Sequence, residues 1–293
     1  MKRMAASELV KGAGDPGLFG PGSVTWRIHA HPTMLIGGLR SLIVQALNPL
    51  SMAGVAQHSN YKDDSWGRLM RTTDYVMTTT YGDTAAAERQ VKIVKTIHER
   101  VKGVDDFTGL PYSANDPELL LWVHCAQVDA FVSAYRAYGP GLSDEEEDGY
   151  VREMALLGEM FGISAKSLPR TMNEMRDYMD SQQLVCTPPA KDAMKFILFP
   201  PVPWPGGKLP EIPARKLLLI PGRAGYSLYS LATIAILPTE VRRAYRLPWV
   251  PLTPMLKASV FALTRTMRRV FPPPPTIRNA MERQRELEAD NVA

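Results

Sequence analysis

Hydrophobic residues recur at intervals of three and four along most of this chain, and glycines and prolines separate the periodic segments. This spacing puts apolar side chains on one face of a helix, whereas a strand would alternate them with polar ones. The pattern therefore predicts an all-α fold with helices over residues 32–46, 64–81, 85–102, 117–138 and 143–162.

Residues that begin or end helices mark several of these boundaries. Ser143 and Glu146 stand three residues apart before an apolar run, which is the spacing of a capping box. Asp64 or Ser65 is a suitable N-cap for the second helix, and Gly103 follows the third where a left-handed residue belongs. These signals support the helix boundaries that the apolar spacing gives.

Prolines divide the remaining chain. Residues 188–213 contain eight prolines and predict an extended connection, after which the spacing indicates further helices over 215–237 and 252–271. Four prolines at 272–275 set off a charged tail, 277–293, with little apolar surface. We expect that tail to be a solvated helix or a disordered segment.

The sequence favours one domain. Residues 12–22 are rich in glycine and proline, so residues 1–30 are expected to be a lead-in and residues 272–293 a charged tail. The segment after the 188–213 connection is short and apolar, so it needs the earlier helices as its packing partner. We therefore expect a single helical domain over residues 31–271.

Composition limits the functional classes. Hydrophobic residues make up 45% of the chain, yet no apolar run is long enough to span a membrane, and residues 1–12 lack the apolar core of a secretory signal. These features predict a cytoplasmic protein. Cys125 and Cys186 cannot form a disulfide framework and have no zinc-ligand spacing. A net charge of +4 gives no argument for nucleic-acid binding.

Histidines are the scarcest chemistry-bearing residues, and His98 has an unusual setting. On its predicted helix it shares a side with Val91, Val94 and Val101, so it is expected to point inward. A buried imidazole is costly unless its nitrogens find partners. One suitable partner is the iron of a haem. The alternative is a core histidine bonded to a carbonyl or a carboxylate, which is the commoner arrangement.

His124 poses the same question, because it shares a helix face with Leu120 and Phe131. Two other histidine patterns have less support. A zinc-protease helix would need a second histidine four residues after His98, where Lys102 stands. His29 and His31 offer only a weak metal site, since no carboxylate lies near them except one in the preceding loop.

The helix over 64–81 carries a polar stripe. Arg68, Thr72, Tyr75 and Thr79 lie at helical spacing, with Arg71 beside them. The stripe is either exposed to solvent or forms a polar wall that faces an anion or a developing oxyanion.

Several phrases resemble the haem-dependent rubber oxygenase (latex-clearing protein) family, which includes the oxygenase of mycophenolic acid biosynthesis. Together they extend from residue 31 to about residue 246. The phrases are His31-Pro32, Gly54-Val55-Ala56-Gln57-His58-Ser59, Gly67-Arg68-Leu69-Met70-Arg71-Thr72, Ile97-His98-Glu99-Arg100-Val101-Lys102-Gly103, Tyr112-Ser113-Ala114-Asn115-Asp116-Pro117-Glu118, Trp122-Val123-His124, Leu237-Pro238 and Val241-Arg242.

This resemblance implies a single globin-like helical bundle that encloses a pocket for haem b, and oxidative cleavage of carbon–carbon double bonds. It implies that His98 is the proximal iron ligand, with His124 next in line among the cofactor-binding residues. It also implies that Arg68, Arg71 and Thr72 are the catalytic residues of the distal side.

The chain departs from that family pattern twice. Arg71 replaces a lysine that can approach the iron, and a permanently charged guanidinium is a poor metal donor. The family also uses a glutamate upstream of the arginine as a base. Residues 48–67 contain no glutamate, only Gln57, Asp63 and Asp64. Proton abstraction therefore has no assigned residue.

The leading hypothesis is a haem b-dependent oxygenase in which dioxygen binds opposite His98 and an apolar, unsaturated substrate lies against a methionine-rich interior. One alternative is a haem-binding or redox-sensing protein without turnover. Another is a haem-free helical module that makes a peripheral membrane contact through residues 252–271, where Lys257, Arg265, Arg268 and Arg269 accompany apolar residues. Oligomeric state and redox partner are not predicted.

Overall fold

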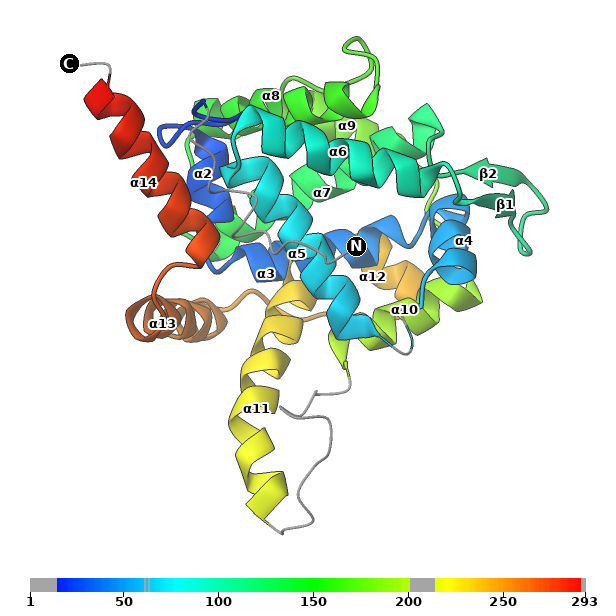
Figure 1. Ribbon diagram of the computed structural model, residues 1–293. Coiled ribbons are helices and arrows are strands. Elements are labelled where there is room, and N and C mark those ends of the chain that lie inside the picture. The colour runs from blue at the N-terminus through cyan, green and yellow to red at the C-terminus, as the bar shows by residue number, and fades with distance from the viewer. Residues whose placement is uncertain (1–14, 61, 63, 201–213, 291–293) are drawn as a thin grey trace.

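The computed structural model describes residues 15–60, 62, 64–200 and 214–290. Within them the chain forms thirteen helices and one two-stranded hairpin, which confirms the all-α prediction (Figure 1). The helices are α2 (Val24–His29), α3 (Met34–Gln45), α4 (Pro49–His58), α5 (Ser65–Tyr81), α6 (Thr84–His98), α7 (Pro117–Tyr138), α8 (Asp144–Phe161), α9 (Met172–Ser181), α10 (Pro188–Leu198), α11 (Ala214–Ala235), α12 (Thr239–Tyr245), α13 (Pro254–Val270) and α14 (Pro275–Asp290).

Helix α7 lies at the centre of the molecule. It contributes buried residues to the three largest hydrophobic clusters, where it meets α2, α5 and α8 on one side and α3, α10 and α11 on others. Helix α3 packs closely along it. A Cβ atom added to Gly37 would lie 2.5 Å from Cδ1 of Phe131, so the two backbones approach each other because position 37 has no side chain.

A buried ion pair joins the same two helices. Arg40 Nη1 donates to Asp129 Oδ2 at 2.5 Å, and Arg40 Nε donates to the carbonyl of Ile236 at 3.1 Å. The arginine side chain is only 4% exposed. Removing one partner would leave a buried charge, so the pair fixes how α3 sits on α7.

The predicted helices over 117–138 and 143–162 are confirmed with nearly the expected bounds. The capping box of α8 is formed as predicted, because Ser143 Oγ accepts from the N–H of Glu146 and the Glu146 carboxylate accepts from the N–H of Ser143. Acidic residues fill its first turn, where they stabilise the positive end of the helix dipole.

The prediction of an extended connection over residues 188–213 is wrong for residues 188–198, which form a helix. Helix α10 begins at Pro188, and Thr187 Oγ1 accepts from the N–H of Ala190. Prolines in the first turn of a helix have no N–H that needs a partner, so they start this helix and do not prevent it. Residues 201–213 lie outside the described residues.

The helix expected over residues 85–102 ends at His98, four residues early. The chain then forms β1 (Lys102–Val104), which pairs antiparallel with β2 (Pro111–Ser113). The connecting turn contains Gly109 with a positive φ of 70°. A strand of three residues is too short to show alternation in the sequence, so the hairpin was not predicted.

The tail beyond residue 271 is a packed helix, which corrects the expectation of a solvated or disordered segment. Helix α14 buries Ile277 and Ala280 in the largest hydrophobic cluster. Arg283 donates from Nη2 to the carbonyl of Tyr81 at 2.9 Å. Helix α14 packs against α5 through this buried side, while Met281 on the same helix is exposed.

The lead-in also holds a buried helix that the sequence did not predict. Helix α2 is six residues long and buries Trp26, Ile28 and His29. The N–H groups of Val24 and Thr25 donate to the carboxylate of Glu153 in α8 at 3.1 and 2.8 Å. The sequence did not predict this helix because it is short. Six residues do not complete two helical turns, so they show no periodic spacing of apolar residues.

Candidate functional site

One large cavity lies among α3, α5, α6, α7 and α8. Its volume is about 430 Å³, which falls in the range of roughly 300–1,000 Å³ typical of ligand pockets. All five residues that the sequence predicted for the site line it: Arg68, Arg71, Thr72, His98 and His124. These five residues come from three different helices, α5, α6 and α7, and therefore meet at one place only in the folded chain.

Apolar side chains form most of the remaining wall. Helix α6 contributes Ile93, Val94 and Ile97, of which Ile93 and Ile97 are about half exposed. Exposed isoleucines on the same face as an inward-pointing histidine mark a surface suited to an apolar ligand. The other apolar lining residues include Met34, Leu35, Leu42, Leu69, Val76, Leu120, Val123, Phe131, Leu157, Phe161 and Ile163.

His98 is the last residue of α6 and lines the cavity. Its Nδ1 atom is buried and has no hydrogen-bond partner among the described residues. Burial lowers the pKa of His98, so the ring is neutral at pH 7. A neutral ring that faces a cavity retains the capacity to bind a metal.

His124 projects from α7 into the same cavity. Burial lowers the pKa of its imidazole to about 4, which keeps this ring neutral as well. Its Cε1 atom would lie 3.3 Å from a Cβ atom added to Gly158, so α8 approaches the ring closely at a glycine. The cavity thus offers two neutral imidazoles on different helices.

Arg68 and Thr72 form the polar part of the wall, one helical turn apart on α5. Arg68 donates from Nη1 to Ser59 Oγ, and Thr72 Oγ1 donates to the carbonyl of Arg68 at 3.0 Å. The threonine hydroxyl is therefore committed as a donor within its own helix. It still has lone pairs with which to accept a hydrogen bond from a ligand.

Arg71 is held at the start of its own helix. Its Nη1 donates to Asp64 Oδ2 at 2.8 Å, and Asp64 is the N-cap residue that also accepts from the N–H of Gly67. Both side chains are nearly half exposed. The arginine that replaces the family lysine thus reaches the rim of the cavity while paired with a carboxylate.

No carboxylate of the described residues lines this cavity. Asp64 is engaged by Gly67 and Arg71. Gln57 lies against the hairpin, where its amide donates to the carbonyl of Val104 and accepts from the hydroxyl of Tyr112. Asp63 lies outside the described residues. The absence of an upstream glutamate in the sequence is therefore not compensated by these neighbours.

The predicted polar stripe of α5 divides into two parts. Arg68 and Thr72 face the cavity, whereas Thr79 is buried and donates to the carbonyl of Tyr75 at 2.9 Å. Tyr75 lines the cavity and packs edge-on against Phe161 with ring centroids 6.1 Å apart. The stripe thus faces the cavity from Arg68 to Tyr75, and only Thr79 enters the core.

The histidine pair near the N-terminus has another role. His29 Nδ1 is hydrogen-bonded to Thr80 Oγ1 at 2.7 Å, and His29 Nε2 to the hydroxyl of Tyr150 at 2.8 Å. His31 Nδ1 is bonded to Thr33 Oγ1 at 2.9 Å. With both nitrogens of His29 occupied, the two histidines do not form a chelating pair, and this weak metal signal has no support.

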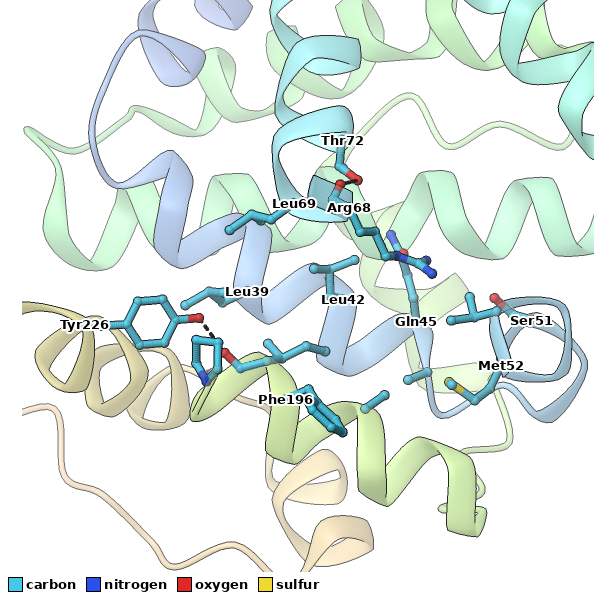
Figure 2. A pocket seen from close by; sticks show the side chains of 15 residues that line it. Leu39, Leu42, Gln45, Ser51, Met52, Arg68, Leu69, Thr72, Phe196 and Tyr226 are labelled. Carbon is cyan, nitrogen blue, oxygen red and sulfur yellow. Dashed lines mark hydrogen bonds between the residues drawn. The ribbon is translucent and has the colours of Figure 1, made fainter. Parts of the chain in front are cut away.

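A smaller pocket of about 100 Å³ adjoins the cavity (Figure 2). Leu42, Gln45, Arg68, Leu69 and Thr72 line both spaces. Figure 2 shows Arg68 and Thr72 on the side of the pocket opposite Phe196 and Tyr226. The rest of this lining is mainly apolar and comes from α3, α4, α10 and, through Tyr226, α11, so an apolar space ends at the polar wall of the cavity.

The sequence pattern did not identify the glutamines that line the cavity as site residues. Gln45, Gln90 and Gln127 line the cavity and are its uncharged polar side chains besides serine, threonine and tyrosine. A glutamine on an otherwise apolar helix face is the signal that could have located them. Their meeting depends on helix packing, which the spacing alone does not give.

The fold and site together define a class: an all-helical protein with a largely apolar cavity whose wall includes two neutral histidines, two arginines and a threonine. The family model described as the catalytic domain of ER-bound oxygenase mpaB/B' and rubber oxygenase matches residues 26–269. This chain therefore belongs to that family of oxygenase catalytic domains, as the resemblance predicted. No curated protein and no solved structure matches it.

Proposed function

We propose that this protein is a haem b-dependent oxygenase that acts on an apolar, unsaturated, isoprenoid- or lipid-like substrate, with His98 as the proximal iron ligand. One observation carries the proposal: a single cavity of about 430 Å³ holds His98 together with Arg68, Arg71 and Thr72 in an otherwise apolar wall. The family supplies the oxygenase class, and the cavity supplies the place for its chemistry.

The residues present fit a haem. A haem pocket needs an apolar enclosure and a neutral nitrogen ligand. His98 has a lowered pKa because it is buried, and its side chain makes no hydrogen bond of ordinary geometry with the described residues. Ile93 and Ile97 on the same helix expose apolar surface that a porphyrin face would cover. His124 is the second candidate ligand in this cavity.

Bound haem would supply iron that activates dioxygen. The protein's own part is binding and electrostatics. Arg68 keeps a permanent positive charge on the wall shared by the two spaces, where it stabilises negative charge that develops on oxygen. At the same place Thr72 Oγ1 can accept a hydrogen bond. If its hydroxyl rotates away from the Arg68 carbonyl, it can also donate one. Arg71 adds positive charge at the rim.

The lining of the smaller pocket supports the proposed substrate class. Apart from Arg68 and a few uncharged polar groups, that pocket is lined by aliphatic residues, Met52 and Phe196. Burial of apolar surface is the main attraction that such a wall offers. A flexible apolar chain with a double bond placed at the polar wall fits this arrangement.

The test is the absorption spectrum of the purified protein after haem supplementation, compared with His98→Ala and His124→Ala. We expect an intense Soret band in the wild type and in His124→Ala, and its loss or strong shift in His98→Ala. A band unchanged in His98→Ala and lost in His124→Ala would transfer the ligand role. No band at any haem concentration would end the haem proposal.

Turnover is a separate question, because a haem-binding or redox-sensing protein without activity would give the same spectrum. The absence of a carboxylate in the described wall of the cavity favours that alternative. Oxygen consumption by the haem-loaded protein with an apolar alkene distinguishes the two. We expect consumption that depends on the alkene, and a rate equal to the alkene-free control would favour the alternative.

We also propose a peripheral contact with an anionic membrane through α13. This helix exposes Met255 and Phe261, which are 78% and 56% exposed. Beside them stand the exposed cations Lys257, Arg265, Arg268 and Arg269, and no acidic residue occurs between residues 241 and 281. A basic amphipathic surface of this kind attracts anionic lipid. In the described part of the chain, every helix is too short or too polar to cross a bilayer.

Flotation with vesicles tests this contact. Deleting residues 252–293 would also remove Leu256 and Val260, which are buried, so substitutions of exposed residues are cleaner. We expect Phe261→Ser with Arg265→Glu to abolish flotation with anionic vesicles, while Phe107→Ser on the hairpin has no effect. Equal flotation of all variants would contradict the contact.

A further inference from the structure

Asn115 lies beside the end of α6, in the turn that joins β2 to α7. It immediately precedes Asp116, the N-cap residue of α7. The N–H of Ala114 donates to the carbonyl of Val101 at 2.8 Å, and the N–H of Asn115 donates to Ser113 Oγ at 3.4 Å. These bonds hold the turn against the segment that leaves α6 after His98.

The amide of Asn115 has a defined orientation. Its Nδ2 donates to the carbonyl of Lys95 in the last turn of α6 at 3.4 Å. Because the nitrogen is engaged there, the oxygen points elsewhere. Asn115 Oδ1 is buried and lacks a hydrogen-bond partner of ordinary geometry among the described residues, and so does Nδ1 of His98. One atom is an acceptor, and the other is a donor in one tautomer of the neutral ring.

The two unsatisfied atoms belong to side chains at the same end of α6. Asn115 Nδ2 is bonded to the carbonyl of Lys95, and His98 is the last residue of that helix. A small adjustment of either side chain would thus satisfy two buried polar atoms at once, and each would otherwise remain costly.

We propose that Asn115 is the positioning residue of His98. Its Oδ1 accepts a hydrogen bond from the Nδ1–H of His98, which holds the neutral ring in the Nδ1–H tautomer and leaves the Nε2 lone pair for the cavity. Metal-binding histidines usually donate their second N–H to a carbonyl or carboxylate, and that bond fixes the ring and raises its basicity. That Nε2 binds the haem iron rests on the proposed function. The tautomer, by contrast, is a property of the protein without haem.

The tautomer is measurable without haem. Imidazole ¹⁵N chemical shifts of the histidine-labelled protein distinguish the two neutral forms, and His98→Gln assigns the signal. We expect the Nδ1–H form in the wild type and a shift toward the Nε2–H form or a mixture in Asn115→Leu, which has similar size and no acceptor. A wild-type signal in the Nε2–H form, or no change in Asn115→Leu, would overturn the proposal.

Ser113→Ala is the matched control, because it removes a hydrogen bond from the same turn and keeps the amide. We expect it to retain the Nδ1–H form. The same tautomer change in Ser113→Ala and Asn115→Leu would assign the effect to the turn and not to the amide oxygen, and would also overturn the proposal.

The haem-loaded protein gives a second measurement, the iron–histidine stretching frequency of the ferrous state by resonance Raman. A stronger acceptor at Nδ1 strengthens the ligand bond, so we expect the frequency to fall from Asn115→Asp through wild type to Asn115→Leu. Equal frequencies in the three proteins would contradict the positioning role. If the wild type takes up no haem but its tautomer depends on Asn115, the proposed function fails and the positioning role stands.

Discussion

Arg68 belongs to both spaces of the site, since it lines the large cavity and the smaller apolar pocket. Its hydrogen bond to Ser59 ties the start of α5 to the end of α4. Arg71, three residues later, is paired with Asp64 near solvent. The two arginines therefore have different expected contributions, although they are equivalent in the sequence pattern.

We expect Arg68→Gln to retain haem uptake and to lose about 10²-fold in alkene-dependent oxygen consumption, the usual cost of removing one stabilising donor. Arg71→Gln is the matched control and should lose less, because its charge is neutralised by Asp64 at 2.8 Å. Stopped-flow or electrode measurement of oxygen consumption checks both. Equal losses in the two variants would contradict the distinct role of Arg68.

His29 predicts how stability depends on pH. Burial lowers its pKa to about 3, whereas the unfolded chain has the ordinary value of about 6.5. The unfolded state therefore binds the extra proton between these values, and the free energy of unfolding falls as the pH drops from 6.5 toward 3. From this residue we expect a loss of about 2 kcal/mol between pH 7.5 and pH 5.

Denaturant unfolding at these two pH values measures the slope. His29→Gln should reduce it, because glutamine does not titrate. His31 and His124 also have lowered pKa values because of burial, so part of the slope remains in His29→Gln. An unchanged slope in His29→Gln would be evidence against a buried neutral His29.

At the scale of elements, the close packing of α3 on α7 depends on a glycine. An added Cβ at Gly37 would meet Phe131 at 2.5 Å, and Phe131 also lines the cavity. Gly38, the next residue, has open space in the same position. The two neighbours therefore separate the steric effect of a methyl group from its effect on helix propensity.

We expect Gly37→Ala to destabilise the protein by about 1–3 kcal/mol, the usual cost of overpacking, and to reduce haem affinity through displacement of Phe131. Gly38→Ala should be neutral or stabilise by up to about 1 kcal/mol, because alanine favours a helix. Chemical denaturation and haem titration measure both effects. A stable Gly37→Ala variant with unchanged affinity would show that α3 and α7 separate readily.

At the scale of the whole molecule, the cavity joins helices from distant parts of the sequence, so a ligand there should stabilise the fold. Five helices form its wall, and α7 connects them to the three main hydrophobic clusters. A cofactor bound only by the folded state adds RT ln(1 + [L]/Kd) to stability.

We expect haem at about 100 times its Kd to add about 2.7 kcal/mol to the free energy of unfolding. Thermal melts with and without haem check this. His98→Ala should show little or none of the increase, whereas His58→Ala, an exposed substitution elsewhere, should show all of it. The same increase in all three proteins would indicate haem binding outside the cavity.

The periodic sequence predicted the long helices and even the capping box of α8, because these features depend on residues that are close along the chain. The same spacing did not predict several short elements. Helices α2 and α12 and the hairpin are too short to repeat a pattern, and the prolines of α10 were interpreted as helix breakers although they stand in its first turn.

The sequence predicted five candidate site residues but not how they are arranged in space. Family phrases placed Arg68, Arg71, Thr72, His98 and His124 in it, and one cavity contains all five. The bonds that occupy Arg68, Arg71 and Thr72 were not predictable, because Ser59 and Asp64 reach them only through the folding of α4 and α5.

The chain by itself determined that the protein is helical, where most of its long helices lie, and which family it belongs to. Those properties follow from the spacing of apolar residues and from short sequence phrases, so they can be recognised without knowledge of distant contacts. Only the tertiary structure decided that α14 is packed, that α6 ends at His98 and that Asn115 lies beside the ring. Each of these depends on burial against residues far away in the sequence, which local patterns do not encode.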